Sequence, residues 1–267
     1  NQAATDAQLN GEGGAIWSTG PLSITKSFFG ENVAFNEGGA IYAGGGANTV
    51  IVESTFVKNQ TLNGGGAIYS GASGTNVMQI FKSDFVENKV SVPARSSYDL
   101  LADDAIGGAI KNAGNFYGYR LSFERNYTEN TKGGGAFANK ASDSVDKVQL
   151  VESAFEDNYA ETTLANVPQT FGGAIYNEGQ MLIKATSIHN NRARVAGGIF
   201  NRNKHIVLAN VTIASNEAQT LGGFANGSPL HTNSDFGTAS FYHVTHANNQ
   251  DQVDQQSPLF ALKSHSI

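Results

Sequence analysis

Gly-Gly-Ala-Ile at residues 38–41 and Phe-Val-Lys-Asn at residues 56–59 decide the fold, because each tetrad returns along the chain in alternation with the other. Self-similarity at a fixed period is the sequence signature of a repeat architecture. Successive copies of the first tetrad begin about 25 residues apart, with two enlarged intervals. These copies begin at Gly13, Gly38, Gly65, Gly107, Gly134, Gly172, Gly197 and Gly222, and the last two lack the alanine.

The second tetrad has the form Phe-x-x-Asn, and isoleucine replaces the aromatic residue in the later copies. An Ile or Leu usually lies five residues before it. The copies are Phe29–Asn32, Phe56–Asn59, Phe85–Asn88, Phe123–Asn126, Phe155–Asn158, Ile188–Asn191 and Ile213–Asn216, with a degraded copy ending at Asn249.

A repeat of this length and composition predicts a parallel β-helix. A leucine-rich repeat would need its Leu-x-x-Leu-x-Leu consensus, and glycine pairs would break each helix of a helical solenoid. A β-helix needs about three short strands per turn, joined by corners with positive φ that Gly and Asn adopt at little cost. The 31 glycines and the low charged fraction of 15% suit that architecture. We therefore expect an all-β solenoid of about eight coils of about 25 residues.

Equivalent residues of successive coils should form columns about 4.8 Å apart. The column that begins with Ile16, Ile41 and Ile68 is apolar and is predicted to face inward. The next column begins with an aromatic strip and later contains Lys111, so alternation predicts that it faces outward. One position further, Asn recurs in five successive coils, and we expect its side-chain amides to form a ladder. These are Asn112, Asn139, Asn177, Asn201 and Asn226.

The alternating tetrads resemble the repeats of the chlamydial polymorphic outer membrane proteins, and the resemblance covers about residues 13–249. It implies a right-handed parallel β-helix passenger of an autotransporter, displayed on the outer membrane and used in cell adhesion and virulence. On this interpretation the 267 residues are a single β-helix domain from a larger surface protein. Residues 13–249 are the coils, residues 1–12 are an N-terminal cap, and residues 250–267 are a cap or a truncated coil.

Composition excludes several classes of protein. The net charge of −6 opposes nucleic-acid binding, which needs a concentrated basic surface. The chain has no cysteine, and therefore no disulfide and no thiolate metal site. No run of 18 apolar residues is present to cross a membrane as a helix.

Two insertions interrupt the repeat and are the predicted binding elements, since irregular loops on a regular scaffold often carry function. They occupy residues 89–106 and 159–171. Each follows the Asn of a Phe-x-x-Asn tetrad, called the motif Asn below, and one coil separates the two coils that carry them. We expect both to leave the same edge of the rod, about 10 Å apart. The first contains candidate contact residues, and its three aspartates are candidate Ca²⁺ ligands. These residues are Arg95, Tyr98, Asp99, Asp103 and Asp104.

Two further surfaces are candidate sites. Trp17, Tyr42 and Tyr69 would stack on adjacent coils and form an aromatic strip for a glycan, or would only stabilise the sheet. A basic cluster within two coils is typical of a polyanion-binding patch or of a solvated face. It comprises Arg192, Arg194, Arg202 and Lys204, with Lys184, His189 and His205 nearby.

The sequence thus favours a secreted or surface-displayed bacterial adhesin that contacts a host, cell or matrix receptor or glycan through the edge with both insertions. No catalytic residue is predicted, and no cofactor other than the Ca²⁺ considered above. An enzyme acting on acidic polysaccharides, either a lyase or a hydrolase, is the alternative, because the basic cluster offers cations for uronate carboxylates. A structural stalk that holds another domain away from the membrane is the third hypothesis.

Overall fold

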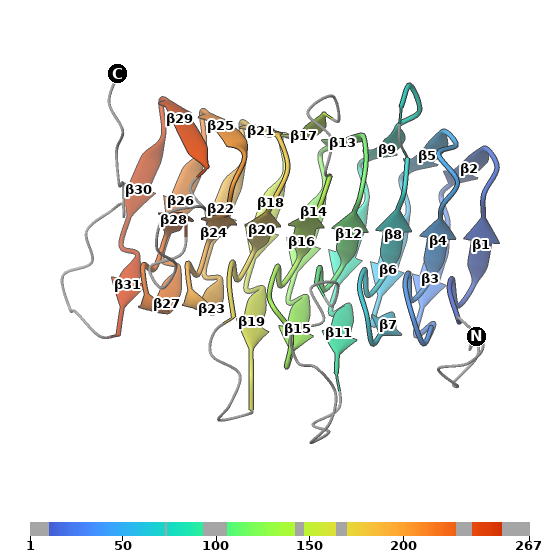
Figure 1. Cartoon of the computed structure of the whole chain (residues 1–267), viewed down its shortest axis with the longest axis horizontal. Coiled ribbons are helices and arrows are strands. Elements are labelled where there is room, and N and C mark those ends of the chain that lie inside the picture. Colours follow the sequence, from blue (N-terminus) through green and yellow to red (C-terminus); the bar gives the residue numbers. More distant parts are fainter. Residues whose placement is uncertain are drawn as a thin grey trace.

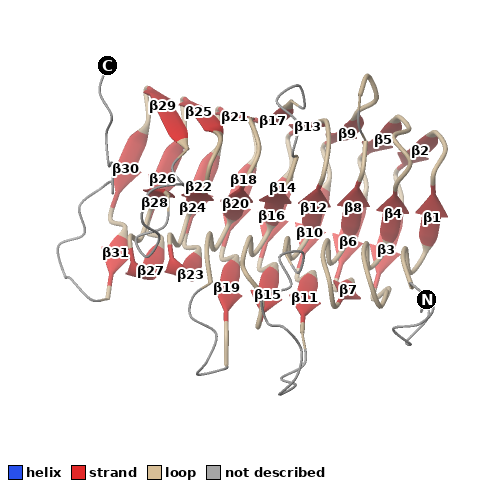
Figure 2. Cartoon of the chain, in the orientation of Figure 1, coloured by secondary structure: helices blue, strands red, loops and turns tan. Residues whose placement is uncertain are grey.

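The computed structural model describes residues 11–72, 74–92, 106–141, 147–163, 170–227 and 237–252. The described part of the chain has strands and turns and no helix (Figure 2). The strands form four sheets, each running along the length of a rod (Figure 1).

Within the described residues, each coil contributes one short strand to each sheet, except that the first coil has no strand in sheet 4. Sheet 1 contains β1 (Ile16–Ser18), β4 (Ile41–Ala43), β8 (Ile68–Ser70), β12 (Ile110–Asn112), β16 (Phe137–Asn139), β20 (Ile175–Asn177), β24 (Ile199–Asn201) and β28 (Phe224–Asn226). Sheet 2 contains β2 (Leu22–Thr25), β5 (Thr49–Val52), β9 (Met78–Phe81), β13 (Phe116–Tyr119), β17 (Val148–Val151), β21 (Met181–Lys184), β25 (His205–Ala209) and β29 (Thr238–Tyr242).

The other two sheets lie before and after the motif Asn. Sheet 3 contains β3 (Phe28–Gly30), β6 (Thr55–Val57), β10 (Asp84–Val86), β14 (Ser122–Glu124), β18 (Ala154–Glu156), β22 (Ser187–His189), β26 (Thr212–Ala214) and β30 (Thr245–Ala247). Sheet 4 contains β7 (Gln60–Thr61), β11 (Lys89–Ser91), β15 (Tyr127–Glu129), β19 (Tyr159–Glu161), β23 (Arg192–Val195), β27 (Glu217–Thr220) and β31 (Gln250–Asp251).

All neighbouring strands are parallel and paired in motif register, so the protein is a right-handed parallel β-helix, as predicted. Ile41 pairs with Ile68, and Phe56 pairs with Phe85. The expectation of three strands per coil is wrong by one, because the chain stays extended after the motif Asn and forms sheet 4. An inward-facing residue of that sheet, such as Val90, is fully buried.

The interior is a set of apolar columns. Phenylalanines of sheet 3 stack face to face, with ring centroids 4.9 Å apart for Phe56 and Phe85. One coil departs from the pattern, since Gly118 stands where the other coils have Ile, Leu or Phe. Leu121 fills the space, because a Cβ on Gly118 would lie only 2.7 Å from its side chain. Two unusual residues in one coil thus compensate for each other.

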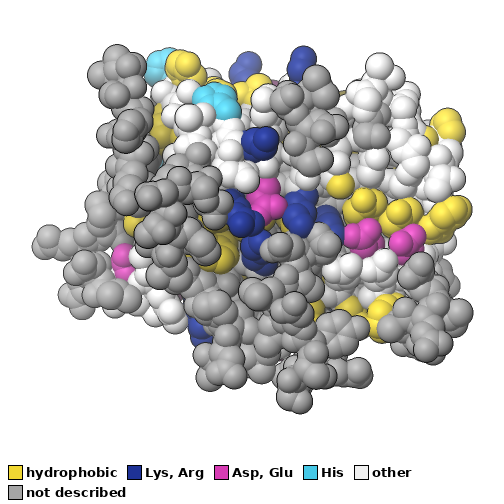
Figure 3. All heavy atoms as spheres, viewed as in Figure 1, with side chains coloured by type: hydrophobic (Ala, Val, Ile, Leu, Met, Phe, Trp, Pro, Cys, Tyr) yellow, Lys and Arg dark blue, Asp and Glu magenta, His cyan; other side chains and the backbone are white. Residues whose placement is uncertain are grey.

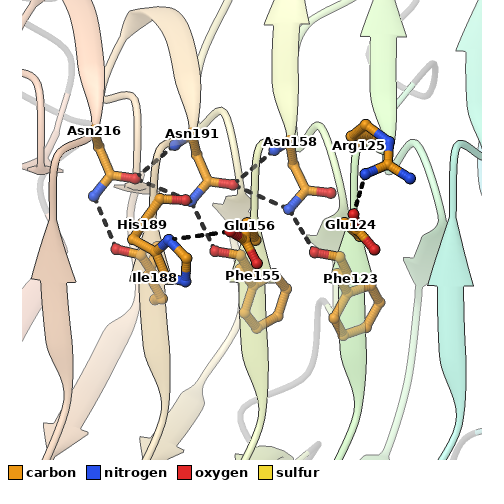
Figure 4. Close-up of polar contacts among 10 residues, drawn as sticks. All are labelled: Phe123, Glu124, Arg125, Phe155, Glu156, Asn158, Ile188, His189, Asn191 and Asn216. Carbon is orange, nitrogen blue, oxygen red and sulfur yellow. Dashed lines mark hydrogen bonds and ion pairs between the residues drawn. The ribbon is translucent and has the colours of Figure 1, made fainter.

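Two buried asparagine ladders run along the rod. In the predicted ladder, the Nδ2 of Asn139 donates to the Oδ1 of Asn177 at 2.8 Å. The motif Asn forms a second ladder, in which Asn158 donates through its backbone N–H and its Nδ2 to the Oδ1 of Asn191, at 2.9 and 3.0 Å (Figure 4). Asn158 Nδ2 also donates to the carbonyl of Phe123 at 2.9 Å. The ladder therefore satisfies buried backbone groups at the corner between sheets 3 and 4.

The two glycines of the tetrad have different physical roles. The first adopts positive φ, for example 75° at Gly107. The second lies against backbone, because a Cβ on Gly108 would be 2.0 Å from the carbonyl oxygen of Gly135. The last two copies of the tetrad therefore begin one residue earlier than the sequence analysis placed them. Ala196 and Leu221 hold the first position, with φ of 56° and 64°.

In those two copies the missing residue is thus the first glycine, and a glycine replaces the alanine. Gly197 and Gly222 hold the second position and keep its close contacts, since a Cβ on either residue would lie 2.3 Å from a backbone carbonyl oxygen.

The outer column of sheet 1 is exposed only in part, which corrects the expectation that it faces solvent throughout. Trp17 is 57% exposed, but Tyr176 and Phe200 are buried in a second apolar cluster on this face. Lys111 is also buried, and its Nζ pairs with Glu37 Oε1 at 2.5 Å.

Candidate functional site

Both insertions leave the rod from sheet 4. β11 precedes the first insertion and β19 precedes the second, and β15 alone lies between these strands in the sheet. The chain returns at Ile106 and Phe171, which both form a β-bridge with Gly133. The bases of the insertions are thus on one edge of the rod, two strand spacings or about 10 Å apart, as predicted. In Figure 1 the strands β11, β15 and β19 lie along the lower edge.

A groove of about 450 Å³ lies on the outer face of the same sheet, beside the first residues of β11 and β15, whereas the insertions follow the last residues of β11 and β19. One wall is the corner between sheets 3 and 4, where Lys58, Glu87 and Arg125 take the left-handed conformation with φ of 54°, 54° and 51°. The other wall is the outer column of sheet 4. The lining residues are Lys58, Gln60, Glu87, Lys89, Arg125, Tyr127 and Tyr159.

The groove has more positive than negative side chains. Lys58 Nζ is 3.6 Å and Arg125 Nε is 3.3 Å from the two carboxylate oxygens of Glu87. Arg125 also pairs with Glu124, outside the groove lining. Lys89 Nζ lies 5.6 Å from the ring centroid of Tyr127, and none of the described carboxylates forms an ion pair with it. The lining therefore has three cations and one carboxylate, and that carboxylate pairs with Lys58 and Arg125.

Tyr127 and Tyr159 stack face to face in this wall, with centroids 4.8 Å apart and an interplanar angle of 8°. The guanidinium carbon of Arg192 lies 5.7 Å from the Tyr159 ring, and Arg192 Nη2 is 3.3 Å from Glu161 Oε2. The pKa of Tyr159 is raised to about 12, mainly by burial and further by the nearby Tyr127 and Glu161. Its hydroxyl stays protonated at neutral pH and is available as a hydrogen-bond donor.

A row of carboxylates lies on the other side of the two tyrosines. Glu129 and Glu161 pair in register two residues further along β15 and β19. Glu129 accepts a hydrogen bond from Ser91 Oγ at 2.7 Å. The tyrosine pair therefore separates a positive groove from an acidic row, and an anionic ligand has a preferred side.

The predicted aromatic strip forms on sheet 1. The rings of Tyr42 and Tyr69 stack at 4.9 Å, and those of Trp17 and Tyr42 at 6.2 Å. Figure 3 shows hydrophobic side chains in a row over β1, β4 and β8. Because the rings cover one another's faces, the strip presents mainly ring edges to solvent. The glycan hypothesis for the strip remains a prediction.

The basic cluster predicted from the sequence takes its residues from two different sheets. Arg192 and Arg194 belong to β23 in sheet 4, whereas Arg202 and Lys204 follow β24 in sheet 1. Arg202 Nη1 contacts Glu178 Oε1 at 2.5 Å. The four cations thus come from two sheets, and the polyanion hypothesis for this cluster remains a prediction.

The remaining predicted contact residues lie outside the described residues: Arg95, Tyr98, Asp99, Asp103 and Asp104. The Ca²⁺ hypothesis rests on three of them and stays a prediction. Within the described ranges, no group of three or more His, Asp or Glu side chains is arranged to hold a metal ion.

Sequence analysis did not select Lys58, Lys89, Arg125, Tyr127 and Tyr159 as site residues. A signal was present, because Tyr follows the motif Asn directly in two successive coils, within Asn-Tyr at 126–127 and 158–159. The remaining residues of the groove come from different repeats, and their convergence depends on which corner each repeat position occupies.

The fold defines the class of the chain as a repeat solenoid, and one comparison finds a segment that is similar to a known repeat family. Residues 53–71 match the model of the Chlamydia polymorphic membrane protein (Chlamydia_PMP) repeat. That segment covers β6, β7 and β8, and so includes one motif Asn and one glycine tetrad. The repeat family suggests a surface-exposed protein of a bacterial outer membrane. No curated protein and no solved structure matches the chain. The described residues include no helix that is long and apolar enough to span a membrane.

Proposed function

We propose that the chain is the binding rod of a surface-displayed bacterial adhesin. It contacts a receptor or glycan on a host cell, a neighbouring cell or the matrix through the edge of sheet 4 that carries insertions 89–106 and 159–171. One observation supports this proposal above others: β11 and β19 are separated by β15 alone, so both irregular segments leave one edge. Irregular segments held by a rigid scaffold are favourable binding elements.

The outer face of sheet 4, next to the insertions, is chemically suited to recognition. It combines a groove, three cations and two tyrosines, whereas the interior columns repeat the same few residue types. Tyrosine and arginine are enriched where binding energy is concentrated, because each combines apolar area with hydrogen-bond donors.

Deletion of residues 94–104 tests the proposal, because it keeps β11 and Ile106 in place. We expect binding of the purified chain to cells to fall at least about fivefold, as is typical when a principal contact is lost. The circular dichroism spectrum should remain that of a β protein. The control removes residues 143–145 between β16 and β17, at another corner, and should bind as the unmodified chain does. Undiminished cell binding after the 94–104 deletion would contradict the proposal.

A further inference from the structure

We propose that the groove lined by Lys58, Lys89 and Arg125 binds a strand of an acidic polysaccharide. The carboxylate or sulfate groups of the polysaccharide contact the three cations, and its hydroxyl groups contact the tyrosine edges. This inference rests on the proposed function, since it names a ligand class for the outer face of the same sheet.

Charge is the first argument. Glu87 is the single carboxylate in the groove lining, and it lies between Lys58 and Arg125 at 3.6 and 3.3 Å. Lys89 contacts the ring of Tyr127 instead of a described carboxylate. Arg125 also pairs with Glu124, so the three cations lie beside two carboxylates and keep an excess of positive charge. An anionic ligand therefore gains charge-assisted hydrogen bonds from cations that the protein itself only partly neutralises.

Spacing is the second argument. Lys58, Lys89 and Arg125 come from three successive coils, so the positive groups repeat along the rod at about 4.8 Å per coil. An extended acidic polysaccharide presents its anionic groups at regular intervals along one direction. A groove parallel to the rod axis meets such a chain with several cations at once.

The tyrosines favour sugar over nucleic acid. The facing sides of Tyr127 and Tyr159 are covered by each other at 4.8 Å, and Lys89 and Arg192 lie over the outer faces. Nucleobases bind single-strand sites by stacking on open aromatic faces, which this pair does not offer. The protonated hydroxyl of Tyr159 is instead a donor for sugar hydroxyls or acidic groups.

A second groove differs from the first in its charge. It has a volume of about 520 Å³ and lies at the corner between sheets 2 and 3. Its lining has one cation and one carboxylate, Arg120 and Glu152, and these pair with each other at 2.8 Å. That groove is neutral and lacks the three-cation series.

The test measures binding of the full 267-residue chain by titration calorimetry at low and at physiological ionic strength. The probes are a heparin-derived octasaccharide, a hexamer of galacturonate, the neutral sugar cellohexaose and an octapeptide of glutamate. We expect the two acidic sugars to bind more weakly as salt increases, because exposed charges are screened. Cellohexaose and the peptide should bind at least about tenfold more weakly, since each lacks one of the two kinds of contact.

Variants assign the binding to the groove. Lys89→Gln should weaken acidic-sugar binding about fivefold, near the upper range for one exposed ion pair. The triple variant Lys58→Gln/Lys89→Gln/Arg125→Gln should weaken it by more than about thirtyfold. Lys82→Gln and Lys147→Gln remove the same charge on other faces and should change binding by less than about twofold.

Equal binding of acidic sugars by the triple variant and the unmodified chain would overturn the inference, as would preferential binding of the glutamate peptide. Either result leaves the proposed function intact if the 94–104 deletion still lowers cell binding. Conversely, groove-dependent sugar binding together with cell binding that survives this deletion would support the groove and contradict the role of the insertion.

Discussion

The interior columns of the rod and the outer column of sheet 4 are built on the same coils but differ in how strictly they repeat. The motif Asn and the second glycine of the tetrad keep their residue type from coil to coil. The outer column of sheet 4 changes at nearly every step and reads Gln60, Lys89, Tyr127, Tyr159, Arg192, Glu217 and Gln250.

The difference separates stability from recognition. A residue that contacts the next coil's backbone has one acceptable identity, whereas an outward residue contacts only its column neighbours and the ligand. In a solenoid each coil contacts only its neighbours, so stability is approximately a sum of such local terms. Substitutions inside should therefore change stability, and substitutions on sheet 4 should change binding.

The largest effect is expected at the second glycine. Gly108→Ala places a Cβ 2.0 Å from the Gly135 carbonyl oxygen, and backbone cannot move aside as a side chain can. We expect the free energy of unfolding to fall by more than about 3 kcal/mol. Gly20→Ala is the control, because a Cβ there meets no atom within 4 Å. Urea denaturation measures both, and equal stability of the two variants would refute the role assigned to the second glycine.

The next effect concerns the asparagine ladder. Asn126→Ala removes the oxygen that accepts from the backbone N–H and the Nδ2 of Asn88, both at 3.0 Å, and leaves buried donors unpaired. The expected loss is about 2–3 kcal/mol. Asn32→Ala should lose less, about 1 kcal/mol, because Asn32 donates to Asn59 and accepts from no described residue. Similar losses at both positions would show that the ladder is not what stabilises the middle of the rod.

A smaller effect tests the compensation within one coil. Leu121→Ala opens a cavity beside Gly118 and should cost about 2 kcal/mol. The double variant Gly118→Ile/Leu121→Ser restores the residue types of the other coils and should be more stable than either single change. A double-mutant cycle measures the coupling energy, and additive effects would contradict the compensation.

The smallest effect is expected on sheet 4. Because the folded-state pKa of Tyr159 is raised to about 12 from an ordinary value near 10, its contribution to stability is complete below pH 10 and is lost as pH rises toward 12. Tyr159→Phe should therefore reduce the alkaline loss of stability, with little change at pH 7. Urea denaturation at pH 7 and pH 11 provides the measurement. An unchanged pH dependence would argue against the burial of this hydroxyl.

The sequence predicted the coil architecture well because its determinants are local and repeated. Backbone approach, inward packing and the ladders impose the same residue at the same position in each coil. The site was predicted less well, because it draws on different repeat positions: Lys58 and Arg125 precede the motif Asn, whereas Lys89 and Tyr127 follow it. The groove lies beside the strands of sheet 4, and the expectation of three strands per coil did not include that sheet. The burial of Tyr176 was missed for a related reason, since a second apolar cluster covers an outward position.

The corner between sheets 4 and 1 is also where extra length is entropically inexpensive. Between Gly65 and Gly107 the chain takes 42 residues to complete a coil instead of about 25. Loop-closure entropy grows only with the logarithm of length, so the free energy of closing the longer coil is only about 0.5 kcal/mol less favourable than that of a regular one. The coils on either side keep their register through Gly64, Ile106 and Gly133. Loops of different length at this corner should therefore cost the rod little closure entropy.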